Sequence, residues 1–189
     1  MGGWRSLRRW LLAGVGLWLL FTSVACGGTP PGGAPPVDYG AMRTLLKEEQ
    51  ALWQSLRPAA YSFHIHAVSM CGEPTLAVTV SDDQPVTVGE VDTTSEPATV
   101  TPLWVSGQDA LIPYEFGCWA STIEEFLDDY GTLDRLFAVS EQQLRYATGG
   151  SIIDVTYDPL WHFPNSLFVA HEAASEYNAF DVTDFLVQK

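Results

Sequence analysis

The sequence is poor in basic residues, and this shortage limits the partners that the protein can have. Its 189 residues contain 9 Lys and Arg against 23 Asp and Glu, which gives a net charge of −14. Proteins bind nucleic acids and anionic lipid surfaces mainly through positive charge. The acidic residues are spread along the chain, which is typical of a solvated surface. The composition therefore predicts no nucleic-acid partner.

The sequence also lacks familiar catalytic motifs. It has no Gly-x-Ser-x-Gly nucleophile elbow and no Ser-x-x-Lys pair. The segment ATGGS at residues 147–151 is not followed by the Lys that a phosphate-binding loop requires. We therefore predict a protein without catalytic activity and without a cofactor.

The apolar run at residues 10–21, WLLAGVGLWLLF, is too short to cross a membrane as a helix, because a spanning helix needs about 20 apolar residues. The run follows Arg5, Arg8 and Arg9 and precedes small residues. This order of a basic, an apolar and a small-residue region is that of a secretory signal peptide. We assign residues 1–25 to that signal.

Cysteine is scarce, and the first of the three cysteines ends the signal region. Ala25 followed by Cys26 resembles a bacterial lipobox, in which cleavage precedes a cysteine that carries lipid; Ser23 stands where Leu is more common. Ordinary secretory cleavage and an uncleaved anchor are the alternatives. We predict that Cys26 is lipidated.

Residues 26–37 are rich in Gly and Pro and carry no charge, so we interpret them as a flexible tether. Removal of residues 1–25 would leave 6 basic residues against 23 acidic ones, a net charge of −17. The predicted location is the cell membrane or the outer membrane, with the lipid on Cys26 in the bilayer and the protein facing outside the cytoplasm.

The two remaining cysteines would lie in an oxidising compartment. An even number of cysteines there is typical of disulfide bonding. We predict a bond between Cys71 and Cys118, which would fasten the irregular segment 92–117 to a strand. Two separately buried thiols are the alternative.

Hydrophobic periodicity predicts a single domain over residues 38–189. A helix is expected over residues 38–58, with Asp38 as its cap and Pro58 as its stop. Two more helices are expected over residues 121–131, with Ser121 and Glu124 as a capping box, and over residues 132–149, with Thr132 as the cap. The apolar stripe of the first helix consists of Met42, Leu45, Leu46, Leu52, Trp53 and Leu56.

Alternating apolar and polar residues predict strands. The expected strands are residues 61–69, a hairpin over 75–91, and 151–158, 166–172 and 177–187. Residues 92–117 show no sustained period and are expected to form a long connection with a short strand at 103–105. Strands joined by hairpins, with helices between them, predict an α+β fold in which helices pack on one face of an antiparallel sheet.

Several segments together resemble the bacterial lipoprotein family catalogued as domain of unknown function 6174. They span most of residues 45–187 and are LWQSLRPAAYSFHI, LAVTV after Cys71, TLDRLFAV, VTYDPLWHFPNSLFV and FDVTDF. The most specific positions are Tyr157, Asp158, Pro159 and Pro164. The resemblance implies a lipoprotein of α+β fold and implies no reaction. From its place before Pro159, Asp158 is expected to serve as a turn residue that binds nearby backbone amides.

His64 and His66 are the candidate metal ligands. Residues two apart on a strand share one face, and two such histidines can hold zinc when a third ligand completes the site. The alternative is a pair of imidazoles on the solvent face of a sheet. The SDDQ turn at residues 81–84 lacks the ligand pattern of a calcium loop and is expected to be a surface turn.

Three classes of function remain open. The main hypothesis is a noncatalytic envelope lipoprotein that binds an unknown envelope protein or small ligand. The second is a metal-binding or metal-dependent module that uses His64 and His66. The third is an enzyme of unrecognised type.

Overall fold

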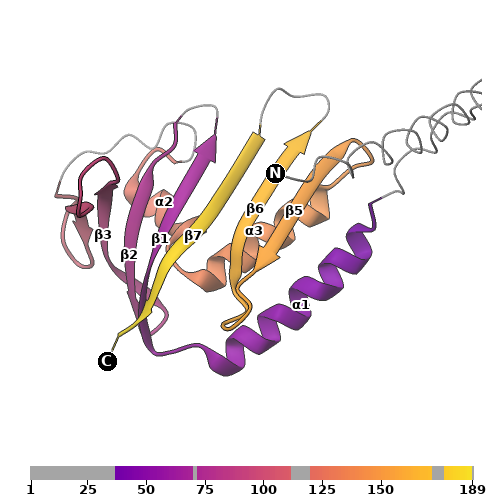
Figure 1. The fold of residues 1–189 in the computed structure, drawn as a ribbon, viewed down its shortest axis with the longest axis horizontal. Coiled ribbons are helices and arrows are strands. Elements are labelled where there is room, and N and C mark those ends of the chain that lie inside the picture. Colours follow the sequence, from indigo (N-terminus) through magenta and orange to yellow (C-terminus); the bar gives the residue numbers. More distant parts are fainter. Residues whose placement is uncertain (1–36, 70–71, 112–119, 172–176, 189) are drawn as a thin grey trace, which may run out of the picture. The chain divides into compact units, whose positions relative to one another are not determined.

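Seven antiparallel strands form one sheet in the order β4-β3-β2-β1-β7-β6-β5 (Figure 1). The computed structural model describes residues 37–69, 72–111, 120–171 and 177–188. Contacts divide the chain after Pro36, and the sheet belongs to the unit Val37–Lys189. The strands are β1 Ala60–Ser69, β2 Thr75–Ser81, β3 Gln84–Asp92, β4 Thr99–Val105, β5 Ser151–Tyr157, β6 Pro164–His171 and β7 Tyr177–Val187.

Three helices pack against one face of this sheet. They are α1 Tyr39–Leu56, α2 Ile123–Tyr130 and α3 Leu133–Tyr146. In Figure 1, α2 and α3 lie behind the strands, and no helix of the described residues covers the face toward the viewer. The predicted α+β fold is therefore confirmed. Within the described residues, no helix has the length and apolar character to cross a membrane.

The alternation of β1 divides its side chains between the two faces of the sheet. Tyr61, Phe63 and Ile65 are fully buried in the core, whereas His64 and His66 are half-buried on the other face. Successive side chains of a strand point to opposite faces, so a sequence period of two produces one apolar and one polar surface. We call the second surface, which no described helix covers, the open face.

Trp53 joins α1 to the core. Its side chain has no exposed surface, and its ring contacts Tyr61, Phe163 and Phe185 at centroid distances of 5.7, 5.8 and 6.2 Å. All three contacts are edge-on, an arrangement that the charge distribution of aromatic rings favours. One side chain of α1 thus touches β1, β7 and the turn between β5 and β6.

The predicted apolar stripe of α1 is buried only in part. Leu46 and Trp53 are buried, but Leu45, Leu52 and Leu56 are 44%, 44% and 46% exposed. α1 contacts the sheet through Trp53 and also contacts α3, so one strip of its surface meets the core, and these three leucines lie along the border of that strip. The helix bounds agree with the prediction: the Asp38 side chain accepts a hydrogen bond from the Ala41 N–H at 3.0 Å, and α1 ends before Pro58.

β4 is longer than the short strand predicted at residues 103–105, because it begins at Thr99. Its first four residues are all exposed, so the alternation that identifies a strand is missing there. Pro102 can lie within β4 because β4 is an edge strand and the pairing with β3 shifts register between Val88 and Gly89, the partner of Pro102; edges and irregularities of this kind are where a sheet tolerates proline. The predicted long connection therefore contains a complete edge strand.

The capping box of α2 lies one residue later than predicted. Thr122, rather than Ser121, is the N-cap, and its hydroxyl oxygen accepts a hydrogen bond from the Glu125 N–H at 3.1 Å. The Glu125 carboxylate in turn accepts from the Ser121 N–H at 2.6 Å. Two pairs in the sequence have the spacing of a capping box, Ser121 with Glu124 and Thr122 with Glu125. The second pair is the one adopted, and the helix that it begins buries Ile123, Phe126 and Leu127. The cap predicted for α3 at Thr132 is confirmed.

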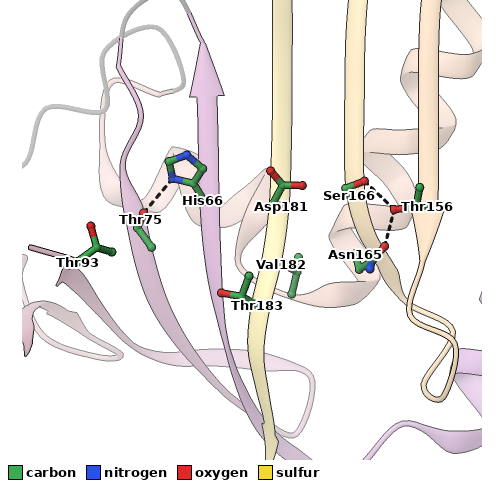
Figure 2. A pocket seen from close by; sticks show the side chains of 9 residues that line it. All are labelled: His66, Thr75, Thr93, Thr156, Asn165, Ser166, Asp181, Val182 and Thr183. Carbon is green, nitrogen blue, oxygen red and sulfur yellow. Dashed lines mark hydrogen bonds between the residues drawn. The ribbon is translucent and has the colours of Figure 1, made fainter. Parts of the chain in front are cut away.

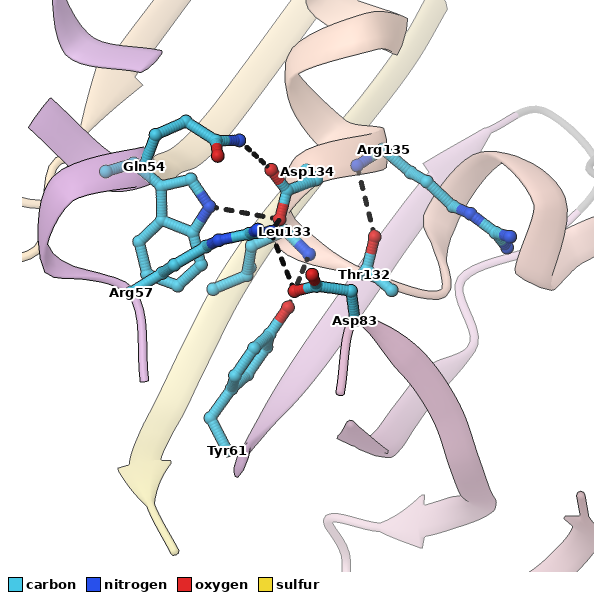
Figure 3. A network of polar contacts seen from close by, with 9 residues as sticks. Gln54, Arg57, Tyr61, Asp83, Thr132, Leu133, Asp134 and Arg135 are labelled. Atoms are coloured by element: carbon cyan, nitrogen blue, oxygen red, sulfur yellow. Dashed lines mark hydrogen bonds and ion pairs between the residues drawn. The ribbon is translucent and has the colours of Figure 1, made fainter. Parts of the chain in front are cut away.

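One carboxylate, that of Asp134 in the first turn of α3, links α1 to α3 (Figure 3). It accepts hydrogen bonds from the Trp53 indole N–H at 3.2 Å and from the Gln54 amide. The Arg57 guanidinium lies 3.2 Å from Asp134 and 2.7 Å from Asp83, which follows β2. Because the negative charge stands at a helix N-terminus, the helix dipole also favours it.

Asp134→Ala is expected to lower the free energy of unfolding by about 2 kcal/mol, because hydrogen bonds to a charged group contribute about 1.5–3 kcal/mol and three donors lose their acceptor. Urea unfolding followed by tryptophan fluorescence would measure the change. Asp129→Ala, at an exposed position of α2, is the matched control and should change stability by less than about 0.5 kcal/mol. Equal effects of the two substitutions would contradict the linking role.

Candidate functional site

Five polar side chains form one row across the open face (Figure 2). Paired positions run from Thr156 on β5 to Ser166 on β6, then to Asp181 on β7, His66 on β1 and Thr75 on β2. Directly opposed residues of antiparallel strands place their side chains on the same face about 5 Å apart. We call this set the polar row.

Hydrogen bonds connect the members at both ends of the polar row. His66 Nδ1 lies 2.9 Å from the Thr75 hydroxyl. The Thr156 hydroxyl donates to the Asn165 side-chain oxygen at 2.6 Å and lies 2.7 Å from the Ser166 hydroxyl. Since a hydroxyl has one hydrogen, Ser166 is the donor to Thr156. The side-chain oxygen of Asn165 is thus occupied, and its amide nitrogen is the side-chain group that can donate a hydrogen bond to a ligand.

The polar row lies in an open hollow of about 700 Å³. No Lys or Arg is found among the described residues that line it, and Asp181 is the charged group of the lining. Five of the lining side chains carry a hydroxyl group. The hollow is lined by His66, Thr75, Thr93, Thr156, Asn165, Ser166, Asp181, Val182 and Thr183.

A turn after β3 brings Thr93 to the margin of the hollow. Asp92 accepts hydrogen bonds from the Thr94 N–H at 2.8 Å and from the Thr94 hydroxyl at 2.6 Å. These bonds, the side-chain bond first, lower the pKa of Asp92 below its usual value. The ionised carboxylate therefore stabilises the turn at neutral pH, and the turn places Thr93 beside the sheet.

The two candidate metal ligands, His64 and His66, share the open face as predicted, but they have different partners. His64 Nδ1 lies 3.0 Å from a carboxylate oxygen of Asp184, whereas His66 contacts Thr75. Within the described residues, no group of three or more His, Cys, Asp or Glu could hold a metal ion. The metal hypothesis receives no third ligand from this part of the chain and stays a prediction.

The four motif residues lie at the connection between β5 and β6: Tyr157 ends β5, Asp158 and Pro159 belong to the turn, and Pro164 begins β6. The Asp158 carboxylate accepts hydrogen bonds from the Leu160 and Trp161 N–H groups at 2.9 and 2.7 Å. The turn role predicted for Asp158 is therefore confirmed. Since this hairpin carries Thr156, Asn165 and Ser166, the motif positions one end of the hollow.

A contact with α1 holds the same turn from the core side. His162 Nδ1 lies 2.8 Å from a carboxylate oxygen of Glu49.

Burial, together with the negative charge of Glu49, raises the pKa of Tyr157 to about 12. Tyr157 is therefore a neutral packing residue at physiological pH, and it is not available as a phenolate.

The three cysteines lie outside the described residues, so the lipidation of Cys26 and the bond between Cys71 and Cys118 stay predictions. The disulfide prediction requires that neither thiol reacts with an alkylating reagent in denaturant until a reductant is added. Mass measurement of the protein with and without prior reduction tests this directly. Alkylation of both thiols in the unreduced protein would show two free cysteines.

Most of the hollow was not predicted from the sequence. His66 was identified, but Thr75, Thr156, Ser166 and Asp181 were not. Their polar character follows the strand period of two, so each could be assigned to the face away from the core. Their meeting in one row depends on β7 lying between β1 and β6, which no local pattern specifies.

Comparison with models of known protein families finds no match, and comparison with curated proteins finds no similar chain. The function must therefore be argued from the residues of this chain and their arrangement.

Proposed function

We propose that the protein is a noncatalytic, lipid-anchored binding module of the bacterial cell envelope and that the open face of its sheet is the binding surface. The observation that carries this proposal is the polar row, which crosses five strands within one hollow. These side chains contribute nothing to the apolar core on the opposite face. Their concentration in a concave surface favours a role in recognition.

The order of residues in the polar row separates the Ser166 hydroxyl from the His66 imidazole. Asp181 lies between Ser166 and His66, so the imidazole and the hydroxyl are two strands apart, about 10 Å at the usual strand spacing. A general base must come within hydrogen-bonding distance of its nucleophile. His66 also contacts Thr75, on the side away from Ser166. This geometry argues against Ser166 as a nucleophile that His66 activates.

The anchor determines where binding would take place. The described fold begins at Val37, 11 residues after Cys26. A Gly- and Pro-rich tether of that length extends about 3 Å per residue, or roughly 35 Å. The resemblance to a bacterial lipoprotein family supports the same location. The ligand would therefore be a molecule found within a few tens of Å of the bilayer surface.

A photo-crosslinking residue placed at Thr183 of the full-length protein in cells is expected to form covalent adducts, because Thr183 is exposed on the open face. The same probe at Gln142, an exposed position of α3, is the matched control and should form few. Asp181→Lys, beside the probe, should reduce the Thr183 adducts at least fivefold. Equal labelling from both positions, or labelling that Asp181→Lys leaves unchanged, would contradict the proposal.

Elemental analysis of the purified full-length protein tests the metal-binding alternative. If the protein is a metal-binding module, the analysis would find one metal ion per chain, and His64→Ala together with His66→Ala would remove it. We expect no metal that depends on these two residues.

A further inference from the structure

We infer that the hollow on the open face binds an uncharged, hydroxyl-rich chain, of which a neutral oligosaccharide is the example, laid across the strands. This inference rests on the proposed function and adds the chemical class of the ligand. It is argued from the length of the polar row, its direction, its charge and its hydrogen-bonding groups.

The length of the polar row favours an extended ligand. From Thr75 on β2 to Thr156 on β5 there are four strand spacings, a distance of about 19 Å at the usual spacing. Thr93 lies at the margin beyond Thr75. A single small molecule would contact part of this row, whereas a chain of several units would contact all of it.

The direction of the row argues against binding by strand addition, because β5 is the one strand of the row that lies at an edge of the sheet. β2, β1, β7 and β6 are each paired on both sides, so their backbone groups already take part in the ladders of the sheet. A peptide that binds by adding a strand needs a free sheet edge. Recognition on this face must therefore come from side chains, which stand roughly perpendicular to the sheet.

The charge of the lining disfavours an anionic ligand. The described lining holds one carboxylate, Asp181, and no Lys or Arg, and the chain after Cys26 is strongly acidic. Phosphate and carboxylate groups are usually bound through Arg or Lys. A polycation would require more than one exposed carboxylate in the hollow. A neutral ligand fits this lining better than either.

The hydrogen-bonding groups match a ligand that carries hydroxyls. The five hydroxyl oxygens of the lining can accept hydrogen bonds from the hydroxyl groups of a ligand, while the hydrogens of Thr156 and Ser166 already serve bonds within the hollow. Asp181 can accept two such bonds, and the Asn165 amide nitrogen can donate. An apolar platform lies beside them: Phe168, two residues after Ser166 on β6, is on the same face and 41% exposed. A sugar ring has an apolar C–H face that could pack against this ring.

The test is a titration of the full-length protein, in detergent micelles, with neutral oligosaccharides of β-linked glucose, β-linked N-acetylglucosamine and α-linked glucose. We expect at least one series to shift the NMR signals of the hollow. Its affinity should rise from the monosaccharide to the tetrasaccharide at least tenfold. Oligogalacturonate, a chain of similar size with a carboxylate on every unit, should bind at least tenfold more weakly than the best neutral series.

Variants of the hollow provide the control for site and folding. Ser166→Ala with Thr183→Ala is expected to weaken binding of the best neutral oligosaccharide about tenfold, and Phe168→Ala to weaken it comparably. Gln142→Ala on α3 should leave the affinity unchanged. Far-UV circular dichroism identifies a variant that fails to fold, and Thr183→Ala alone, at an exposed position, then replaces it.

The outcomes separate this inference from the proposed function. If an anionic chain or a cationic peptide shifts the signals of the hollow and the neutral sugars do not, the ligand class is wrong while the binding surface stands. Equal affinity for mono- and tetrasaccharides would overturn the extended ligand. If no probe shifts these signals and Thr183 yields no specific adduct in cells, both proposals fail.

Discussion

Trp53→Ala is expected to lower the free energy of unfolding by about 3–5 kcal/mol, a large part of the total stability of a domain of this size. The indole has no exposed surface, and it contacts the rings of Tyr61, Phe163 and Phe185. Its removal would leave a cavity where α1 meets the sheet, and it would also take a donor from Asp134. Denaturant unfolding followed by far-UV circular dichroism measures the effect without relying on tryptophan fluorescence.

Leu52→Ala is the matched control, because Leu52 precedes Trp53 in the same helix and is 44% exposed. Leu52→Ala should lower the free energy of unfolding by less than about 1 kcal/mol, since only part of the side chain leaves an apolar environment. The loss of unfolding free energy in Trp53→Phe should lie between those of Trp53→Ala and Leu52→Ala, because this substitution keeps an aromatic ring and loses the indole N–H. If Trp53→Ala were no more damaging than Leu52→Ala, Trp53 would not be the residue that anchors α1.

Cys26→Ser is expected to release the protein from the membrane fraction or to leave it unprocessed. Serine cannot carry the thioether-linked lipid that the lipobox resemblance predicts at this position. Two or three acyl chains, each contributing about 0.8 kcal/mol per buried methylene, hold a protein stably, whereas one chain holds it marginally. Cell fractionation and the intact mass of the purified protein measure location and lipid together.

Cys71→Ser is the control for this experiment, since it removes a thiol at a position outside the lipobox. It should fractionate with membranes as the unaltered protein does and carry the same lipid mass at its N-terminus. If Cys26→Ser were processed normally and also remained in the membrane fraction, the anchor would lie elsewhere in the chain.

The strands with regular alternation were predictable, and those without it were not. β1 carries Tyr61, Phe63 and Ile65 on one face and histidines on the other, so both its existence and its buried side follow from the sequence. β4 could not be identified beyond its last residues, because its exposed first half shows no alternation. An edge strand that packs against little on either face leaves a weak pattern of this kind.

The first helix shows a different limit of sequence patterns. Apolar spacing identified α1 correctly, but it could not say how wide the buried strip would be. That width depends on how the neighbouring elements, here the sheet and α3, surround the helix, and the sequence of the helix does not specify this. Leu45, Leu52 and Leu56 therefore remain partly exposed although they satisfy the helical period.

The hollow could not be predicted for a topological reason. The pairing of His66 with Asp181 joins residues 115 positions apart, and Asp181 with Ser166 continues the row across β6. The order of the strands in the sheet decides which distant residues lie side by side, and several strand orders would satisfy the same hydrophobic pattern. The sequence does specify the composition of the open face, which is rich in Thr, Ser and His at alternate positions.

The central place of β7 has a consequence for how the chain folds. β7 is the last strand in the sequence, yet it lies between β1 and β6, so β4-β3-β2-β1 and β6-β5 form two partial sheets until it pairs. Contacts between distant parts of a chain form slowly, because the connecting loop must close first. Until the eleven-residue strand β7 pairs, the folding chain therefore has two open strand edges, at β1 and β6. Edges of this kind pair readily with other chains, so the protein is expected to be most prone to aggregation before β7 has joined the two partial sheets.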